Sequence, residues 1–289
     1  MKIKILIPIY NDWQSVFKLL ENIDQQILET KHDFSVLLIN DASKEARPDN
    51  LQNFLNLKKI KIINMKKNRG HARCIAAGLK YIFENEEFDY VIPMDGDGED
   101  RPEEIKQFVD NFSYHQNKPI VGERIKRSES LFFKICYSIH KVLTFTFTGQ
   151  SIKFGNYTCL PKSIIEKMIN EKATWSSYSG SLAKISKDRA IIESERGTRY
   201  FGPSKMSFLN LLKHSLAIIG VFKFNALIRS ILFIIVYMFL IHQNISFIML
   251  IPIILVLIFI IATFSISRRE NLDEFNNSLA NISNIDNLK

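Results

Sequence analysis

A cluster of carboxylates directly follows an apolar run at residues 91–94. In the stretch MDGDGEDRPEEI, residues 94–105, Asp95 and Asp97 are separated only by Gly96. Carboxylates this close raise one another's pKa unless a cation lies among them. A hard divalent ion is typically held by one or two carboxylates together with the phosphates of a ligand. Asp95 and Asp97 are therefore candidate ligands of a divalent metal ion.

The same stretch also has a simpler interpretation. Acidic residues are favoured in the first turn of a helix, and proline suits its first position. A helix beginning near Pro102 would explain Asp100, Glu103 and Glu104. It would not explain Asp95, which comes before such a helix, beside a glycine that allows close approach of the backbone. From this stretch alone, a metal site and an acidic turn both remain open.

The first 112 residues alternate short apolar runs with amphipathic segments. Strands are expected at residues 2–9, 34–40, 60–65 and 90–94, and helices at 13–27, 71–83 and 102–112. This alternation predicts an α/β fold with a mostly parallel sheet and right-handed crossovers. The apolar run at the N-terminus is too short for a signal peptide and contains Pro8, so it is interpreted as the first strand.

Polar residues follow each of the four expected strands. The four groups are Tyr10 to Asp12, Asn40 to Ser43, Asn68 to His71, and Asp95 to Asp97. Parallel α/β sheets bind ligands outside the carboxyl ends of their strands. Convergence of the four groups on one edge predicts a binding site there.

Several classes of protein are disfavoured by motif and composition. No G-x-G-x-x-G follows the first strand and no Gly-Lys-Ser/Thr occurs, which argues against a dinucleotide dehydrogenase and a P-loop enzyme. The net charge of +8 suits a nucleic acid, an anionic membrane surface or phosphorylated ligands equally. The basic residues cluster beside apolar segments, however, so no nucleic-acid partner is expected. The three cysteines show no metal-binding spacing, which favours a reducing compartment.

Two nearly uncharged segments, residues 230–241 and 245–264, lie toward the C-terminus. A helix needs about 20 apolar residues to cross a bilayer. Both segments are long enough if the first begins near Ala226, and the short link at 242–244 predicts a helical hairpin. Basic residues on both outer sides of the pair predict that both ends are cytoplasmic. A buried core hairpin is the alternative, and the polar residues after Arg269 are expected to be a loosely ordered end.

Four motifs occur in an informative order and spacing: ILIPIYND, LLINDAS, NRGHARCIAAG and MDGDGEDRPEEI. Together they resemble the nucleotide-sugar domain of family-2 glycosyltransferases. The membrane-anchored polyprenyl-phosphate glycosyltransferases, relatives of dolichyl-phosphate mannose synthase, are the most similar. The resemblance extends over residues 3–240 and includes VGERIKR at 121–127 and RYFGPSKMS at 199–207, which precede paired membrane helices in that family too.

The resemblance implies a GT-A (Rossmann-like) α/β fold with helices on both faces of the sheet, then interfacial helices and a C-terminal transmembrane hairpin. The expected division is a transferase domain at 1–205, an amphipathic segment at 206–225, two membrane helices at 226–266 and a polar cytoplasmic tail at 267–289. Residues 131–147 and 206–222 have helical apolar stripes that suit either core packing or the membrane interface.

The resemblance also assigns roles to residues. Pro8, Tyr10, Asp12, Asp41, Asn68 and Gly70 are implied to bind the nucleotide, while Asp95 and Asp97 are implied to hold Mg²⁺ or Mn²⁺ on the diphosphate, Asp97 more surely. Arg199 and Lys205 flank a loop whose cations suit a donor or acceptor phosphate, although a solvated basic loop is the alternative. Arg124 and Arg127 are candidates for the acceptor phosphate, or surface charges at the start of a helix.

The implied activity is inverting transfer of a sugar from a nucleotide-diphosphate sugar, uridine favoured over guanosine, to a polyprenyl phosphate at the cytoplasmic membrane face. Relatives often carry an acid near Asn156, and asparagine cannot act as a base. A phosphate acceptor needs no base whereas a hydroxyl does, so the difference favours a lipid phosphate. Transfer to a hydroxyl of a lipid-linked glycan, with Asp100 or Glu99 as base, and a non-catalytic nucleotide-sugar-binding module remain as alternatives. A homo-oligomer is compatible with the resemblance.

Overall fold

The computed structural model describes residues 1–48, 53–126, 131–203 and 208–289. The chain divides into two compact units. The first comprises Met1–Ser128, Lys153–Lys205 and Asn271–Lys289, and the second comprises Glu129–Ile152 and Met206–Glu270. The sequence predicted that the transferase domain would be continuous from 1 to 205 and followed by separate segments. The structure differs in two places, because residues 129–152 join the second unit and the C-terminal residues return to the first.

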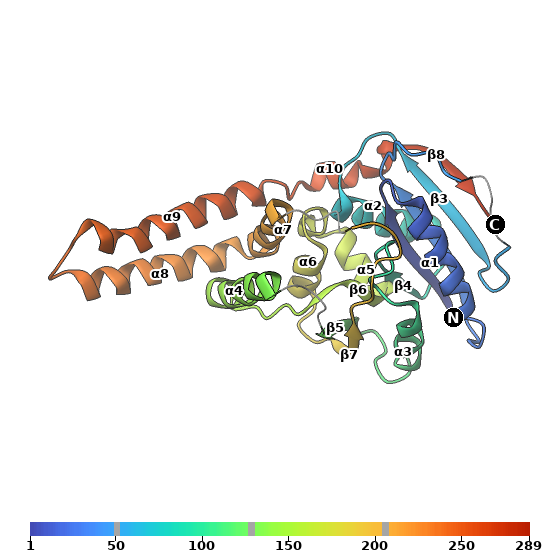
Figure 1. Ribbon diagram of the computed structural model, residues 1–289, viewed down its shortest axis with the longest axis horizontal. Helices are drawn as coiled ribbons and strands as arrows, with labels where there is room; N and C mark the ends of the chain where they lie inside the picture. The colour runs from blue at the N-terminus through green and yellow to red at the C-terminus, as the bar shows by residue number, and fades with distance from the viewer. Residues whose placement is uncertain (49–52, 127–130, 204–207) are drawn as a thin grey trace. The chain divides into compact units, whose positions relative to one another are not determined.

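The first unit is built on a mixed sheet (Figure 1). Within the described residues its strand order is β7-β5-β6-β4-β1-β2-β3-β8. The strands are β1 (Lys2–Ile9), β2 (Asp33–Asn40), β3 (Lys59–Met65), β4 (Tyr90–Pro93), β5 (Ile120–Lys126), β6 (Phe154–Pro161), β7 (Ala190–Glu195) and β8 (Ile282–Asn287). Strands β4, β1, β2 and β3 are mutually parallel, whereas β6 runs antiparallel to β4 and to β5. The predicted α/β fold with a mostly parallel sheet is confirmed.

Alternate residues of β1 face opposite layers of helices, as the two-residue period of a strand requires. Ile3, Ile5 and Ile7 share one buried cluster with α1 (Trp13–Gln26) and with Phe108 of α3 (Ile105–Asp110). Leu6 faces the other way, against α2 (His71–Asn85), where a Cβ at Gly78 would lie 2.4 Å from Leu6 Cδ1. Burial on both faces explains the nearly continuous apolar sequence of β1.

The acidic stretch after β4 includes the short helix that the simpler interpretation expects. Pro102 begins the 3₁₀ turn η1 (Pro102–Glu104), which continues into α3. Glu104 is buried and accepts hydrogen bonds from Ser194 Oγ at 2.7 Å and from the backbone N–H of Glu195 at 2.8 Å. Glu104 therefore ties the turn to β7, and Asp95 and Asp97 precede that turn.

The expectation of a loosely ordered C-terminal end is wrong. Residues after Asn271 form α10 (Leu272–Asn276), the 3₁₀ turn η3 (Ser278–Asn281) and β8. Figure 1 shows β8 beside β3, and the two strands pair antiparallel from Lys61 with Asn287 to Met65 with Ile282. An edge strand needs few buried side chains, because its backbone ladder provides most of the contact. The polar sequence of β8 therefore does not prevent its pairing.

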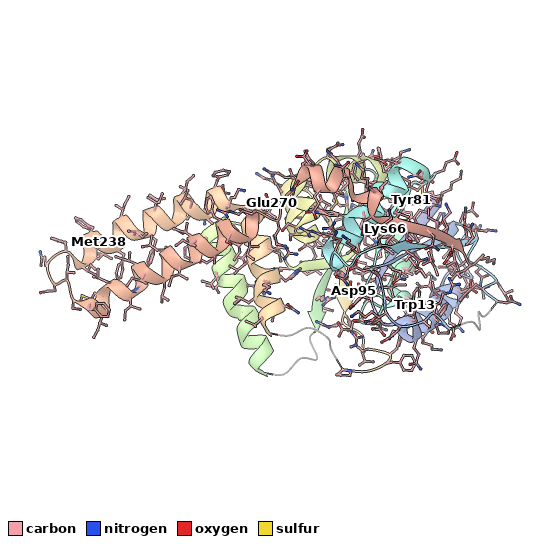
Figure 2. All side chains as sticks on the ribbon, turned by 90° about the horizontal axis from the view of Figure 1, so that it is seen from above. Trp13, Lys66, Tyr81, Asp95, Met238 and Glu270 are labelled. Carbon is pink, nitrogen blue, oxygen red and sulfur yellow. The ribbon has the colours of Figure 1, made fainter. Side chains whose placement is uncertain are left out.

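The second unit contains the two predicted apolar helices, α8 (Lys223–Ile241) and α9 (Phe247–Ser267). By length and composition both could cross a membrane, and only 11% of the residues in each apolar window are buried. The core helix of a soluble protein would be mostly buried, so this exposure disfavours the alternative of a core hairpin. Met238, labelled in Figure 2, lies near the turn of the hairpin, and Glu270 lies at its open end.

Two further helices accompany the hairpin in the second unit: α4 (Leu131–Thr148) and α7 (Phe208–Val221). Phe147 of α4 contacts Phe259 of α9, with ring centroids 4.6 Å apart. Arg229 of α8 donates to the carbonyl oxygens of Phe145 and Thr146, at 3.3 and 3.0 Å. A guanidinium at a helix C-terminus binds carbonyls that the helix itself leaves unpaired. Arg229 therefore joins α8 to the end of α4.

Candidate functional site

The residues after β1, β2, β3 and β4 meet at one edge of the sheet, as predicted. β1 lies between β2 and β4, so its carboxyl end is a topological switch point, the kind of place at which open α/β sheets bind ligands. Asp12 follows β1, Asp41 follows β2, His71 follows β3, and Asp95 follows β4. Figure 2 labels Asp95 among the side chains of this unit.

Asp95 is held by two side chains from different elements. Its Oδ1 lies 3.0 Å from His71 Nε2 and 3.4 Å from Asn156 Nδ2. Within the described part of the chain, both side-chain hydrogen bonds to this carboxylate are made to Oδ1. Oδ2 is therefore available to a cation. Asn156 thus lies in the site, at the position where an acid was considered.

Asp97 is tied to a loop that precedes the second unit. Its Oδ1 accepts from the backbone N–H of Glu99 at 3.0 Å, and its carbonyl oxygen accepts from the N–H of Tyr200 at 3.0 Å. Gly98 has φ +90°, and a Cβ there would lie 2.6 Å from the ring of Tyr200. Only glycine permits both that backbone conformation and the close approach. The glycine after Asp97 therefore allows residues 197–200 to pack on the acidic turn.

Gly96 has a different role from the one that the sequence suggested. A Cβ at Gly96 would lie 2.8 Å from Val16 Cγ2 of α1 and 3.2 Å from Ile7 Cγ2 of β1. The close neighbours are thus core side chains of the protein. Gly96 allows the acidic turn to lie directly on α1 and β1.

Arg199 connects two carboxylates at this edge of the sheet, those of Asp97 and Asp12. Its guanidinium donates to Asp97 Oδ2 and to Asp12 Oδ2, each at 2.6 Å, and its side chain is 13% exposed. Asp12 is fixed in turn by Ser15 Oγ, which donates to Asp12 Oδ1 at 2.6 Å. The Nε–H of Arg199 is buried and has no hydrogen-bond partner among the described residues. Because a buried unpaired donor is costly, this N–H favours a site that a ligand oxygen completes.

Asp100 is engaged within the protein. Its side chain is 3% exposed, its Oδ2 accepts from the N–H of Asp95 at 2.8 Å, and its Oδ1 accepts from Arg124 at 3.2 Å. Arg124 lies in β5 and not at the start of a helix, which corrects that interpretation. Arg124 therefore supports Asp100, and Asp100 positions Asp95. Glu99, the other base considered, is paired with Arg196.

Asp41 also supports a loop. Its two carboxylate oxygens accept from the backbone N–H groups of Arg69 and Gly70, each at 2.8 Å. Gly70 has φ +92° and precedes the first residue of α2, His71. Asp41 thus fixes the turn that brings His71 to Asp95. The resemblance implies direct nucleoside contact for Asp41, and the structure shows that it positions this turn.

The pKa values of these acids shift in opposite directions, because burial and mutual repulsion raise them whereas neighbouring cations lower them. Burial, reinforced by the neighbouring Asp95 charge, raises the pKa of Asp97 to about 6 and that of Asp100 to about 7. Burial also opposes the charge of Asp95, but His71 and Arg124 together hold its pKa well below the usual value. Burial would likewise lower the pKa of His71, yet Asp95 raises it overall. Carboxylates crowded in this way favour an added cation.

The donor set suits Mg²⁺ or Mn²⁺ bound together with a diphosphate. Asp95 and Asp97 offer hard oxygen ligands at a switch point. The described residues contain no group of three or more histidine, cysteine, aspartate or glutamate side chains arranged to hold a metal. Two carboxylates are too few for an all-protein cage, and they match a cation that takes its remaining ligands from phosphates and water.

Some of the remaining predicted residues lie at this edge of the sheet, and others lie outside the residues that the structure describes. Pro8 is buried in β1 beside Ile39, and Tyr10 is exposed just beyond the strand. Asn68 is exposed in the loop that Asp41 fixes. Lys205 and Arg127 lie outside the residues that the structure describes. His71 was expected at this edge as part of the polar group 68–71, but its contact with Asp95 was not predicted, because no histidine pair marked it as a ligand.

The chain belongs to glycosyl transferase family 2, because the model of that family matches residues 4–165. Undecaprenyl-phosphate 4-deoxy-4-formamido-L-arabinose transferase of Proteus mirabilis (strain HI4320) is 28% identical over 221 residues, which cover 73% of this chain and 64% of that protein. The same-named transferase of Photorhabdus laumondii is 29% identical, with 73% and 65% covered. The match thus spans slightly less than two thirds of these relatives. Resemblance to family 2 is confirmed.

Solved structures show the same fold at low identity. A mannosyltransferase from Pyrobaculum calidifontis in complex with GDP-Man and Mn²⁺ has a TM-score of 0.51 at 12% identity, with 96% of this chain and 74% of that one covered. Glucosyl-3-phosphoglycerate synthase from Mycobacterium tuberculosis, in complex with Mn²⁺, UDP and phosphoglyceric acid, has a TM-score of 0.54 at 10% identity and 78% coverage of both chains. These likenesses support the GT-A fold.

Proposed function

We propose that this protein transfers a sugar, with inversion at the anomeric carbon, from a nucleotide-diphosphate sugar to a polyprenyl phosphate. The observation that carries the proposal is the arrangement of Asp95 and Asp97 beside the Arg199 guanidinium at the switch point. Carboxylates for a cation and an arginine with a buried unpaired N–H are suited to a diphosphate leaving group. The similarity to transferases named for undecaprenyl phosphate supports the same acceptor class here.

The donor would occupy the edge formed by the ends of β1, β2 and β4. Tyr10 presents an exposed ring to the nucleoside, with Pro8 and Asp12 at the same strand end. Asp41 fixes the backbone of Arg69 and Gly70, so that Asn68 and Gly70 can contact the nucleotide. Asp95 and Asp97 would hold Mg²⁺ or Mn²⁺, which supplies charge neutralisation on the departing nucleoside diphosphate. Arg199 adds a second positive group on the Asp97 side.

The environments of the acids favour a phosphate acceptor. A hydroxyl acceptor needs a base within hydrogen-bond reach, whereas a phosphate is already an anionic nucleophile. Asp100 is buried and both its oxygens accept hydrogen bonds from protein groups, and Glu99 is paired with Arg196. Asn156, near Asp95, cannot accept a proton as a carboxylate would. Uridine is the favoured donor base, with GDP-mannose as the second candidate.

The membrane part of the proposal rests on α8 and α9. Their exposed apolar surfaces suit a lipid environment, and the acceptor class is a lipid. Lys223 begins α8, and Arg268 and Arg269 follow α9, which favours a cytoplasmic location for both ends. Pairing of β8 with β3 requires the chain to return to the side from which it left, and a two-span hairpin meets this requirement.

An assay of the purified protein in detergent tests the proposed reaction. With Mn²⁺ and undecaprenyl phosphate, we expect turnover with at least one member of a panel of UDP-sugars and GDP-mannose. The matched acceptor control is undecaprenol, which presents a hydroxyl in place of the phosphate. Turnover only with a lipid-linked glycan would support transfer to a hydroxyl instead, and nucleotide binding without any turnover would support a non-catalytic module.

The topology gives a second prediction. We expect epitope tags at residue 1 and residue 289 to be digested only when a protease has access to the cytoplasmic face. Asn244→Cys, in the link between α8 and α9, is expected to react with a membrane-impermeant maleimide from the opposite face. Protein without the added cysteine corrects for labelling of the native ones. Tags on opposite sides of the membrane would contradict the two-span hairpin.

A further inference from the structure

Glu274 lies where the C-terminal segment meets the candidate donor site. It belongs to α10, the short helix after the membrane hairpin, and Asn271 caps that helix by accepting from the Glu274 N–H at 2.9 Å. The Glu274 carboxylate contacts three side chains: Arg69 at 2.9 Å, Arg73 at 3.2 Å and the Trp175 indole N–H at 2.9 Å. One carboxylate of the C-terminal segment thus joins the loop after β3, the first turn of α2 and the 3₁₀ turn η2 (Lys172–Trp175).

The rest of the segment follows the same loop. Asn281 donates through Nδ2 to the carbonyl oxygen of Lys67 at 3.0 Å, and its own carbonyl accepts from the N–H of Lys66 at 2.7 Å. Lys66 Nζ donates to the carbonyl oxygen of Ala280 at 2.9 Å. Figure 2 labels Lys66 in this unit. Residues 66–73 are therefore bound both by the C-terminal segment and by the Asp41 carboxylate just after β2.

Packing fixes α10 against the protein. Phe275 is fully buried and stacks on Trp175, with ring centroids 5.4 Å apart and an interplanar angle of 18°. The Arg73 guanidinium lies over the Trp175 ring, with its Cζ 5.2 Å from the ring centroid. A buried aromatic pair and a cation over an aromatic ring restrict the position of the Glu274 backbone. The Glu274 carboxylate is therefore held in place, and it restricts the positions of Arg69 and Arg73 through its ion pairs with them.

We propose that Glu274 is a positioning residue for the donor site, acting through the loop Asn68–His71. This loop carries two groups of the site: the backbone at Gly70, which Asp41 binds, and His71, which contacts Asp95. Loss of the carboxylate leaves Arg69 and Arg73 without their shared anion and removes the acceptor of the Trp175 N–H. The inference rests on the proposed function, which assigns nucleotide binding to the carboxyl ends of β1, β2 and β4. The contacts of Glu274 do not depend on the reaction.

The test compares variants of the full-length protein in detergent. Glu274→Ala is expected to weaken binding of UDP–Mn²⁺ or GDP–Mn²⁺, whichever the wild type binds, roughly tenfold, the usual effect of losing a charged hydrogen bond. Where transfer is measurable, the donor KM is expected to rise by a similar factor and kcat to change less. Glu274→Gln can still accept from Trp175 and from one arginine, so it is expected to recover most of the affinity. Asp273→Asn, an exposed acid in the same helical turn, is the control and is expected to match wild type.

Amide hydrogen exchange provides a readout that needs neither nucleotide nor turnover. In Glu274→Ala, the amides of Arg69, Gly70 and the first turn of α2 are expected to exchange faster, while those of β1 and β2 remain protected. One outcome is that the wild type binds neither nucleotide while Glu274→Ala still exchanges faster at these amides. In that case the proposed function fails, but the support of the loop by Glu274 stands. Unchanged exchange and affinity in Glu274→Ala would overturn the inference. So would loss of protection throughout the sheet, or no recovery in Glu274→Gln, because either result indicates a general structural role.

Discussion

Asp97→Asn is expected to lower the rate of sugar transfer by at least about 100-fold, the usual scale when a group that stabilises developing charge is removed. Asparagine keeps an oxygen for the Glu99 N–H but loses the negative charge that would hold a divalent cation on the diphosphate. The fold should persist, because burial and Asp95 already disfavour the charged form of Asp97 and raise its pKa to about 6. Steady-state transfer and thermal unfolding, measured on the same preparation, check both parts.

Asp110→Asn is the matched control for this variant. Asp110 is an exposed acid at the end of α3 in the same unit, and its neutralisation is expected to leave transfer unchanged. Excess chelator should reproduce the loss in wild type, and added Mn²⁺ should reverse it. Full activity in Asp97→Asn, or in chelated wild type, would contradict the metal-dependent proposal.

Arg199→Lys is expected to reduce transfer to polyprenyl phosphate roughly 10-fold to 100-fold, because lysine cannot reproduce the planar fork of arginine. The structure sharpens the reason: Arg199 uses separate nitrogens for Asp12 and Asp97, whereas a single ammonium cannot occupy both positions at 2.6 Å. The Nε–H proposed to face a phosphate oxygen is also lost. Donor binding should change less than transfer, since Asp95 and Asp97 are retained.

The comparison variant is Asp100→Asn, which removes one of the two acids considered as a base. Its effect should come through Asp95, whose N–H the Asp100 carboxylate accepts, and should be smaller than that of Arg199→Lys. The measurement is transfer to undecaprenyl phosphate against hydrolysis of the donor by water, for both variants. Normal transfer in Arg199→Lys together with inactive Asp100→Asn would instead favour deprotonation of a hydroxyl acceptor.

The parallel half of the sheet could be predicted from local sequence. β1 has the predicted bounds, and β2, β3 and β4 differ by one residue at an end, because buried parallel strands are continuous apolar runs between turn residues. The same runs located the edge where Asp12, Asp41 and Asp95 gather. Their partners could not be predicted, because they depend on contacts between distant parts of the chain. Arg199 reaches Asp12 across 187 residues, and His71 reaches Asp95 across 24.

β5, β7 and β8 show why other elements escaped prediction. β5 includes the charged run Glu123, Arg124 and Lys126, and β7 alternates exposed and buried residues over only six positions. β8 is rich in asparagine and has no continuous buried face. Such strands are defined by their neighbours in the sheet more than by their own sequence. Arg124 was a candidate for the acceptor phosphate, and its contact with Asp100 became evident only from the fold, which places it in β5.

The pairing of β8 with β3 has a consequence for the order of events during synthesis. β3 leaves the ribosome early, whereas β8 is made only after both apolar helices. Throughout that interval the outer edge of β3 has no strand beside it, and open edges are the places where foreign chains add. A chain that stops within the hairpin would keep this edge exposed permanently. Completion of the catalytic sheet therefore follows translation of the whole hairpin, so a finished sheet is found only in chains that already carry both apolar helices.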